Sequence, residues 1–316
     1  MELDGNRTHL KLGARGSLLS RSQSGQVAAA MEERWPGLKV ELVIVRTSGD
    51  TIQDRPLHEF GGKGLFTKEL EQTLLAGEVD FAVHSFKDVP VTMPLVAQDD
   101  LVIAGVPPRA DPRDLLVSAR ARSLAGLPAG ARVGTGSLRR QAQVLRARPD
   151  VQVLPIRGNV DTRLGKLRSG DYDAVVLALA GVRRAGLFDE ALMTPLEVDV
   201  CLPAAGQGAL ALQCRRDDAY VRGLLSDLGD PTTRACVELE RQVVELLQGD
   251  CHSPIAALAT MEGGVVRLRA LVAARDGRPP VIAAEASAAI ADAERVVERV
   301  VQALEAQDAR RLLHGG

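Results

Sequence analysis

The chain has 316 residues, 46% hydrophobic and 25% charged, which is ordinary for a soluble globular protein and sufficient for two or three domains with their own cores. A net charge of −2 and an aromatic content of 3% argue against a nucleic-acid-binding protein, which needs a basic surface and stacking side chains. The four cysteines contain no CxxC pair, so neither a metal site nor a disulfide framework is predicted. These cysteines are Cys201, Cys214, Cys236 and Cys251.

No segment of the chain has the pattern of an export signal or a membrane anchor. The N-terminal stretch Met1–Arg15 is charged and lacks the apolar core of a signal peptide. The longest strongly apolar run, Ala174–Val182, is far too short to cross a bilayer. The sequence therefore predicts a cytoplasmic protein that needs no membrane, no nucleic acid and no obligate protein partner.

The first hundred residues alternate between strand and helix patterns, which is typical of an α/β unit. The expected elements are a strand at Leu10–Leu12 entering a loop at Gly13–Ser17, a helix at Ser22–Arg34, a strand at Val40–Val45, a helix at Thr67–Ala76 closed by Gly77, and a buried strand at Asp80–His84. The sequence HSFKDVP (His84–Pro90) thus begins at the carboxyl end of a strand, where α/β sheets usually place their ligands.

A stretch rich in proline and charge, Val106–Arg113, predicts a hinge or a domain crossing. The alternating pattern then restarts and predicts a second α/β unit. Its strands are expected at Arg132–Gly134, Val151–Pro155 and Asp173–Leu179, and its helices at Ser137–Arg146 and Thr162–Leu167. A glycine-rich turn and an apolar strand follow in Leu202–Cys214, and we expect this segment to return the chain to the first unit.

The last part of the chain has a different pattern, a long helix at Thr233–Leu247 followed by several strands and a further helix. The strands are expected at Ile255–Met261, Val265–Ala273 and Val281–Ala286, and an amphipathic helix at Ala291–Ala306 would cover one face of their sheet. The predicted fold class is α/β, with a small α+β domain at the C-terminus. We assign residues 1–106 and 204–228 to domain 1, 107–203 to domain 2 and 229–316 to domain 3.

Four short basic motifs lie on predicted loops. They are GGKGLF (Gly61–Phe66), HSFKDVP, GTGSLRR (Gly134–Arg140) and RGNVDTRL (Arg157–Leu164). Each motif places Arg or Lys beside Gly, Ser, Thr or Asn, so that backbone N–H groups and cationic side chains converge on one point and hold an anion. Asp88 is the acid of the second motif, next to Lys87. This combination indicates chemistry on a substrate that carries many carboxylates or phosphates.

The GTGS loop opens a helix and places Arg139 and Arg140 in the first turn after Ser137. A positive charge there opposes the helix dipole at a cost of roughly 0.3–1 kcal/mol, which a bound anion would offset. The alternative is a solvated basic helix face. Likewise, Arg157 and Arg163 form either an anion site or structural ion pairs with local acids.

Four further residues have an interpretation without a ligand. Lys63 fits a plain glycine-rich turn, because its surroundings lack the spacing of a nucleotide P-loop. Asp88 fits a cap on the turn before Pro90. Taken alone, Cys251 is a small buried hydrophobe, and His84 is interpreted as a packed residue at a strand end rather than a catalytic base.

Taken together and in this order, the motifs resemble the hydroxymethylbilane synthase (porphobilinogen deaminase) family. The resemblance runs from Leu10 to about Ala306. It also includes DPRD (Asp111–Asp114), LALAGVRRAGL (Leu177–Leu187), LPAAGQGA (Leu202–Ala209) and the loop of Cys251. The family implies two domains like the halves of type II periplasmic binding proteins with a cleft between them, and a small third domain that bears a cysteine-linked dipyrromethane cofactor.

The resemblance implies a monomeric transferase of tetrapyrrole and heme biosynthesis. Such an enzyme joins four porphobilinogen units head to tail, releases ammonia at each step and hydrolyses the product to hydroxymethylbilane. The growing chain carries an acetate and a propionate on every ring, so it is a polyanion that Arg side chains can pair. Cys251 would carry the cofactor through a thioether. By motif position, the cofactor would also be bound by Lys87, Ser137, Arg139, Arg140 and Arg157, and the substrate by Arg15, Ser17, Lys63, Arg163 and Arg184.

Asp88 matches the catalytic acid of the family. The resemblance implies that Asp88 assists loss of the amino group to give an azafulvene, stabilises the cationic pyrrole N–H and helps to remove the α-proton. One departure concerns the residue before the cysteine, which is commonly Gly in the family and is Asp250 here. An acid beside a polyanionic cofactor is unfavourable unless its carboxylate points away.

Two other classes of protein remain as alternatives. A two-lobed binding protein for carboxylates or phosphates would explain the basic loops and the hinge, but it would not require Asp88 or Cys251. A nucleic-acid-binding module would show an affinity that falls steeply with salt, which the net charge and the scarce aromatic residues argue against.

Overall fold

The computed structural model describes residues 7–47, 67–91, 100–250 and 252–314. The chain divides into unit 1, formed by Met1–Arg109 and Ala209–Arg234, and unit 2, formed by Ala110–Gly208 and Ala235–Gly316. The first crossing lies within the proline-rich stretch that the sequence predicts as a hinge. The second crossing confirms that the chain returns to the first unit. The three-domain boundaries stay a prediction.

Unit 1 is built on a five-stranded sheet of order β2-β1-β3-β10-β4. Strands β1, β2 and β3 are parallel, whereas β10 runs antiparallel between β3 and β4. The strands are β1 (His9–Arg15), β2 (Lys39–Val45), β3 (Phe81–Ser85), β4 (Leu101–Gly105) and β10 (Leu210–Arg215). The helices are α1 (Leu18–Arg34), α3 (Lys68–Leu75), the 3₁₀ turn η2 (Phe86–Asp88) and α7 (Ala219–Asp227).

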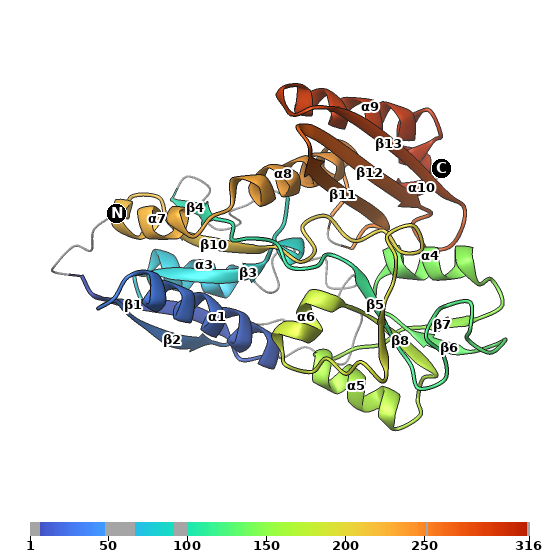
Figure 1. Ribbon diagram of the computed structural model, residues 1–316, viewed down its shortest axis with the longest axis horizontal. Coiled ribbons are helices and arrows are strands. Elements are labelled where there is room, and N and C mark those ends of the chain that lie inside the picture. The colour runs from blue at the N-terminus through green and yellow to red at the C-terminus, as the bar shows by residue number, and fades with distance from the viewer. Residues whose placement is uncertain (1–6, 48–66, 92–99, 251, 315–316) are drawn as a thin grey trace. The chain divides into compact units, whose positions relative to one another are not determined.

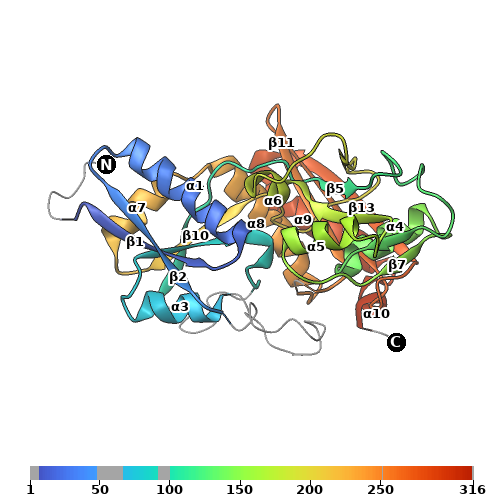
Figure 2. The ribbon, with the colours of Figure 1, turned by 90° about the horizontal axis from the view of Figure 1, so that it is seen from below.

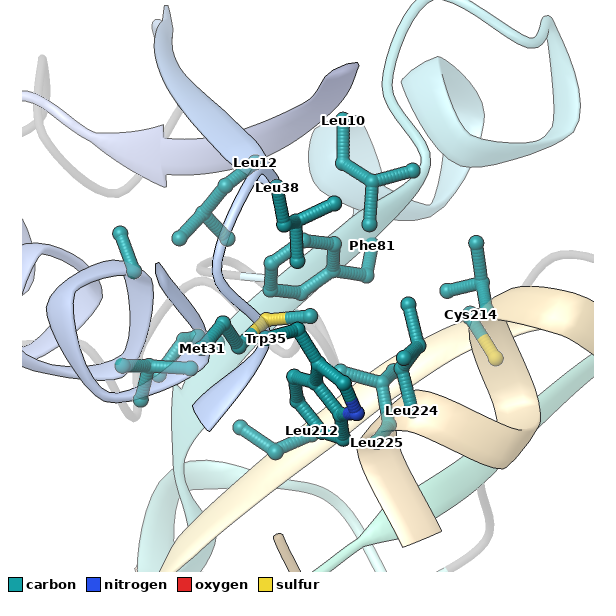
Figure 3. Close-up of a cluster of buried hydrophobic side chains, with 14 of the residues drawn as sticks. Leu10, Leu12, Met31, Trp35, Leu38, Phe81, Leu212, Cys214, Leu224 and Leu225 are labelled. Carbon is teal, nitrogen blue, oxygen red and sulfur yellow. The ribbon is translucent and has the colours of Figure 1, made fainter. Parts of the chain in front are cut away.

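Helices cover both faces of this sheet, with α1 and α3 on opposite sides (Figure 2). Helix α1 buries Val27, Ala28 and Met31, spaced as one face of a helix requires. These side chains join residues of β1, β3, β10 and α7 in a single cluster around Phe81 and Trp35 (Figure 3). On the other face, α3 contributes leucines to a smaller cluster. The central strands β1 and β3 are therefore buried on both sides, which fixes the position of the loops at their carboxyl ends.

Unit 2 contains a second five-stranded sheet, of order β7-β6-β8-β5-β9. Strands β6, β7 and β8 are parallel, and β5 runs antiparallel between β8 and β9. The strands are β5 (Asp114–Val117), β6 (Arg132–Gly134), β7 (Gln152–Leu154), β8 (Ala174–Ala178) and β9 (Met193–Pro195). The helices are α4 (Leu138–Ala147), α5 (Val160–Arg168) and α6 (Leu179–Arg184).

The two five-stranded sheets share one topology. In each sheet, the first parallel strand (β1 or β6) lies between the second (β2 or β7) and the third (β3 or β8). An antiparallel strand (β10 or β5) then separates the third strand from the last one (β4 or β9). This arrangement is that of the halves of type II periplasmic binding proteins, so the predicted fold class is confirmed. Open sheets of this kind place their ligands at the carboxyl ends of the parallel strands.

The C-terminal part of unit 2 is a three-stranded antiparallel sheet of order β11-β12-β13. One of its faces is covered by α9, as predicted (Figure 1). Valines of α9 at positions 296, 297, 300 and 301 are buried. The elements are α8 (Pro231–Leu246), β11 (Ile255–Glu262), β12 (Val265–Ala273), β13 (Val281–Ala289), η3 (Ile290–Asp292), α9 (Ala293–Glu305) and α10 (Ala309–His314).

The sequence-based elements agree with the structure in kind, and differ mainly at their ends. Strand β1 continues to Arg15, into the first part of the segment Gly13–Ser17 that the sequence assigns to a loop, and α1 begins at Leu18, four residues before the predicted start. Ser17 explains the earlier start, because its side chain caps the helix by accepting from the amide of Ser20. Strands β4, β5 and β9 and helices α6, α7 and α10 were not predicted. Most of them are short, so they show too little periodicity.

Candidate functional site

The loop that carries Asp88 begins at the centre of the unit 1 sheet. The last two residues of β3, His84 and Ser85, point to opposite faces, because side chains alternate along a strand. The η2 turn follows, held by a hydrogen bond from the amide of Phe86 to the carbonyl oxygen of Ala209 (3.0 Å). Phe86 is buried and Asp88 is exposed. The buried aromatic ring therefore fixes a turn whose acid faces solvent.

Basic and hydroxyl groups meet this loop at the same sheet edge. Strand β1 is parallel to β3 and adjacent to it, so Arg15 at its end and Ser17 just beyond lie at the edge where the Asp88 loop begins. The charges of Arg15 and Asp88 both act on the pKa of His84. Lys87 is half-buried within the turn. The structure thus brings together the unit 1 residues that the sequence selects, except Lys63, which lies outside the described residues.

His84 is a packed, neutral histidine, in agreement with the sequence-based interpretation. It is 6% exposed, and its Nε2 atom lies 2.9 Å from Oε1 of Gln213 on β10. Burial lowers the pKa of His84 to about 4, because the charged imidazolium loses its hydration; the positive charge of Arg15 acts in the same direction.

This lowered pKa predicts an acid sensitivity of the fold. The ordinary pKa of a histidine is 6.5, so between pH 6.5 and 4 the imidazole is protonated in the unfolded chain but stays neutral in the folded chain. The contribution of His84 to the free energy of unfolding is therefore complete above pH 6.5. It falls as the pH is lowered, by about 2 kcal/mol from pH 7.5 to pH 4.5. Urea unfolding of wild type and His84→Gln at both pH values measures this loss. Equal losses in the two proteins would contradict the assignment.

In unit 2, Arg139 and Arg140 are buried around a single acid rather than exposed on a helix face. They are 3% and 5% exposed, whereas Asp114, the first residue of β5, is fully buried. Nη1 of Arg139 lies 2.6 Å from Oδ2 of Asp114, and Nη2 of Arg140 lies 2.7 Å from Oδ1. The conflict between two cations and the helix dipole is therefore offset by an anion that belongs to the protein.

The surroundings of Asp114 complete its hydrogen bonding. Gln207 donates to Oδ1 (2.9 Å), and the thiol of Cys201 donates to Oδ2 (3.2 Å). Burial alone would raise the pKa of Asp114, but the charges and hydrogen bonds of the two arginines outweigh it and hold this pKa far below its usual value. Burial raises the pKa of Cys201 to about 12, so this thiol is inert at neutral pH.

The GTGS and RGN loops meet at the carboxyl ends of β6 and β7. These strands are parallel neighbours, with Gly134 paired to Leu154. Ser137 caps α4 by accepting from the amide of Arg140 (3.4 Å). At Gly136, a Cβ atom would stand 3.0 Å from the carbonyl oxygen of Ile156, so the two loops approach closely at a position that favours glycine.

On the RGN loop, Arg157 is half-buried, and Arg163 folds back from α5 so that its Nε donates to the carbonyl oxygen of Gly158 (2.8 Å). Gly158 has a φ of +105°, a conformation that favours glycine. The carbonyl oxygen of Arg157 accepts from Lys166 (3.2 Å). Three cationic residues therefore gather around this one turn.

Arg184 ends α6, the helix that follows β8 at the same sheet edge. Its Nη2 donates to the carbonyl oxygen of Gly208 (2.8 Å), at the end of the GQG turn. Burial lowers the pKa of Arg184 to about 10, because the guanidinium loses hydration. A carboxylate bound against Arg184 would restore this pKa, which makes the residue a suitable anion partner.

Asp250 precedes Cys251, which itself lies outside the described residues. Oδ1 of Asp250 accepts from the amides of His252 and Ser253 and from the hydroxyl of Ser253, each at 2.9 Å. Burial opposes ionisation, yet these hydrogen bonds lower the pKa of Asp250 below its usual value. The carboxylate is thus held, in its ionised form, by its own loop.

Sequence analysis missed the partners that lie under these loops. Asp114 belongs to the DPRD motif, yet nothing in its neighbourhood along the chain indicates that it pairs with Arg139 and Arg140. Glu71 and Gln213, which lie near His84, gave no sequence signal. Within the described ranges, no group of three or more His, Cys, Asp or Glu side chains is placed to hold a metal ion. In the same part of the chain, no helix has both the length and the apolar character to cross a membrane.

Comparison with known proteins identifies the family of this chain. Residues 10–223 match the porphobilinogen deaminase dipyromethane cofactor binding domain, and residues 234–306 match the porphobilinogen deaminase C-terminal domain. Porphobilinogen deaminase of Xanthomonas oryzae pv. oryzae (strain PXO99A) is 49% identical over 307 residues, which cover 97% of this chain and 99% of that protein. The porphobilinogen deaminase of Syntrophobacter fumaroxidans is 46% identical, covering 96% of each chain.

Among solved structures, the methionine binding protein MetQ aligns with 70% of this chain and 89% of its own, with 14% identity and a TM-score of 0.44, a similarity too weak to bear on function. The two family models, by contrast, match consecutive parts of the chain, and the sequence relatives cover nearly all of it. The chain therefore belongs to the porphobilinogen deaminase family.

Proposed function

We propose that this protein is a hydroxymethylbilane synthase that condenses four porphobilinogen molecules head to tail, releases ammonia at each addition and hydrolyses the product. The observation that carries this proposal is the match of both family domains across residues 10–306, with a 49% identical porphobilinogen deaminase covering nearly the whole chain. The product is a precursor of tetrapyrroles and heme. The cytoplasmic location and the monomeric state expected from the sequence stay predictions.

In unit 1, we assign the proton transfers to Asp88. Its carboxylate is exposed on the η2 turn, at the sheet edge where strand β1 ends in Arg15. An ionised carboxylate can pair with the ammonium group of porphobilinogen as this group leaves, and can then accept the α-proton from the ring that has reacted. The acetate and propionate groups would be bound by Arg15, Ser17, Lys63 and Lys87.

The residues of unit 2 fit a dipyrromethane with acidic side chains. The cofactor supplies the pyrrole ring that is joined to the first porphobilinogen. Ser137 and Arg157 lie on the loops that follow two neighbouring strands, and Arg163 of α5 reaches back to the second of these loops. Arg184 is a partly desolvated cation that gains from a carboxylate. The carboxylate of Asp250, which precedes the attachment residue Cys251, is engaged by the amides of His252 and Ser253.

Arg139 and Arg140 differ from the other basic residues of the site, because Asp114 already neutralises part of their charge. Two arginines around one carboxylate leave a net positive charge of one. All three hydrogen bonds of Arg139 to Asp114, Cys201 and Leu202 come from Nη1. We therefore assign its Nε and Nη2 hydrogens to a cofactor carboxylate, while Asp114 holds the guanidinium in place.

Intact mass spectrometry of the purified protein tests the cofactor and its attachment. We expect a covalent addition that corresponds to two linked pyrroles, and no addition in Cys251→Ser, because a hydroxyl is a much weaker nucleophile than a thiol. Cys236→Ser is a matched control, since Cys236 is buried in α8 and should leave the addition unchanged. Turnover of porphobilinogen by the loaded protein then tests the reaction.

An unmodified mass that persists after incubation with porphobilinogen would overturn this proposal. The protein would then be unable to prime its own synthesis. The variant Asp250→Gly would show whether the acid next to Cys251 prevents attachment of the cofactor. A protein that binds porphobilinogen, stays unmodified and releases no ammonia would instead be a two-lobed binding protein.

A further inference from the structure

Three buried polar side chains form a chain of hydrogen bonds under the Asp88 loop. Glu71 on α3, Gln213 on β10 and His84 on β3 are 0%, 1% and 6% exposed. Nε2 of Gln213 donates to Oε1 of Glu71 (3.1 Å), and Oε1 of Gln213 lies 2.9 Å from Nε2 of His84. Burying three polar groups is costly unless each is hydrogen-bonded, so this chain is a specific feature of the site.

The sheet register brings the three residues together. Strands β3 and β10 are antiparallel, with His84 opposite Ala211, so Gln213 is the diagonal neighbour of His84 on the same face. Ala82, which shares this face with His84, packs in one cluster with Leu70 and Leu74 of α3. Helix α3 therefore places Glu71 over the diagonal pair.

This order of groups dictates the protonation of the imidazole. With Glu71 ionised, its oxygens only accept, in agreement with the structure, in which the amide nitrogen of Gln213 faces Glu71 and its oxygen faces His84. An amide oxygen also only accepts, so Nε2 of His84 must carry the hydrogen. Because the ring is neutral, Nδ1 is then left as a hydrogen-bond acceptor.

We propose that the chain Glu71–Gln213–His84 is a positioning device that holds the imidazole of His84 in place, with its hydrogen on Nε2, beneath the Asp88 loop. This inference rests on the proposed function, because it gives Asp88 its catalytic role. Burial keeps this imidazole neutral, so it is not a cation that would compete with the ammonium group of the substrate for Asp88. The fixed ring also fixes the residue at which the HSFKDVP loop begins.

The opposite face of the sheet holds the next residue of the loop independently. Ser85 is hydrogen-bonded to Gln23 of α1 (3.1 Å), which is 4% exposed. The loop is therefore fixed from both sides at its first two residues. A change at Glu71 should alter the tautomer of His84 without releasing Ser85, so the variant should keep its fold.

Nitrogen-15 NMR of the histidine-labelled, cofactor-loaded protein tests the tautomer directly. His84 is assigned as the signal lost in His84→Gln, among the five histidines of the chain. We expect Nε2 protonated and Nδ1 unprotonated in the wild type. In Glu71→Gln, the side chain at position 71 can donate or accept, so Gln213 can turn over and Nδ1-protonated His84 should appear. Glu78→Gln, which removes an exposed acid just after α3, is the matched control.

Steady-state turnover of porphobilinogen by the same variants tests the link to Asp88. For Glu71→Gln, we expect kcat to fall about tenfold or more with little change in KM, because misplacement of a catalytic group affects the chemical step. Glu71→Asp, which keeps a carboxylate, should restore both the tautomer and most of kcat. Glu78→Gln should behave as wild type in both measurements.

Three outcomes would overturn the inference: wild-type His84 protonated at Nδ1 or at both nitrogens, a tautomer unchanged in Glu71→Gln, or an altered tautomer with wild-type kcat. A wild type that binds its cofactor but does not turn over porphobilinogen would instead overturn the proposed function. The NMR result on the tautomer does not depend on activity, so the two failures are distinguishable.

Discussion

Replacing Asp88 by Asn should nearly abolish turnover of porphobilinogen while leaving the fold intact. The amide of Asn cannot accept the proton that a carboxylate takes up, and assistance of this kind typically contributes about 10²–10⁴-fold to a rate. The exposed side chain of Asp88 stabilises little of unit 1, so the thermal unfolding midpoint should stay close to that of wild type. Ammonia release measured with loaded protein is the appropriate assay.

Two comparisons make this result specific to the carboxylate of Asp88. Asp100→Asn removes an exposed acid elsewhere in unit 1 and should retain full activity. Intact mass must show the cofactor on Asp88→Asn, so that lost turnover is not confused with lost loading. A loaded Asp88→Asn protein with near wild-type turnover would remove Asp88 from the mechanism.

Replacing Asp114 by Ala should cost about 3–5 kcal/mol of unfolding free energy, the usual effect of removing one partner from a buried ion pair. Arg139 and Arg140 are almost fully buried, and without the carboxylate their charges would lack compensation. Such a loss is a large part of the stability of an ordinary domain, about 5–15 kcal/mol in total. Urea unfolding measures it, with Asp114→Asn as a milder variant if the alanine variant does not fold.

Matched variants separate the structural role of Asp114 from its role in the site. Asp150→Ala breaks an ion pair with Arg148 at the surface and should change stability little. A triple variant, Asp114→Leu with Arg139→Met and Arg140→Met, should regain much of the lost stability, because well-packed apolar groups can replace a buried charge cluster. It should nevertheless fail to load the cofactor. Unchanged stability in Asp114→Ala would contradict the assignment.

Local features of the sequence were sufficient for most of the elements and for the fold class. The apolar strand after the GQG turn correctly predicted that the chain returns to the first unit, where it forms β10. The run Val265–Ala273 was predicted with the bounds that β12 has in the structure. Ser137 was correctly placed at the start of α4. In each case the signal lies within a few neighbouring residues, which is the range over which periodicity and capping act.

The basic motifs by themselves were also sufficient to identify the family, because their residue types and their order can be read from the sequence without knowledge of the fold. Only the tertiary structure decided what each charge contacts. The two arginines of the GTGSLRR motif pair with an acid 25 and 26 residues earlier in the chain. His84 bonds a glutamine 129 residues away. Such partners are chosen by strand order, register and burial, and these depend on contacts between segments that no local pattern records.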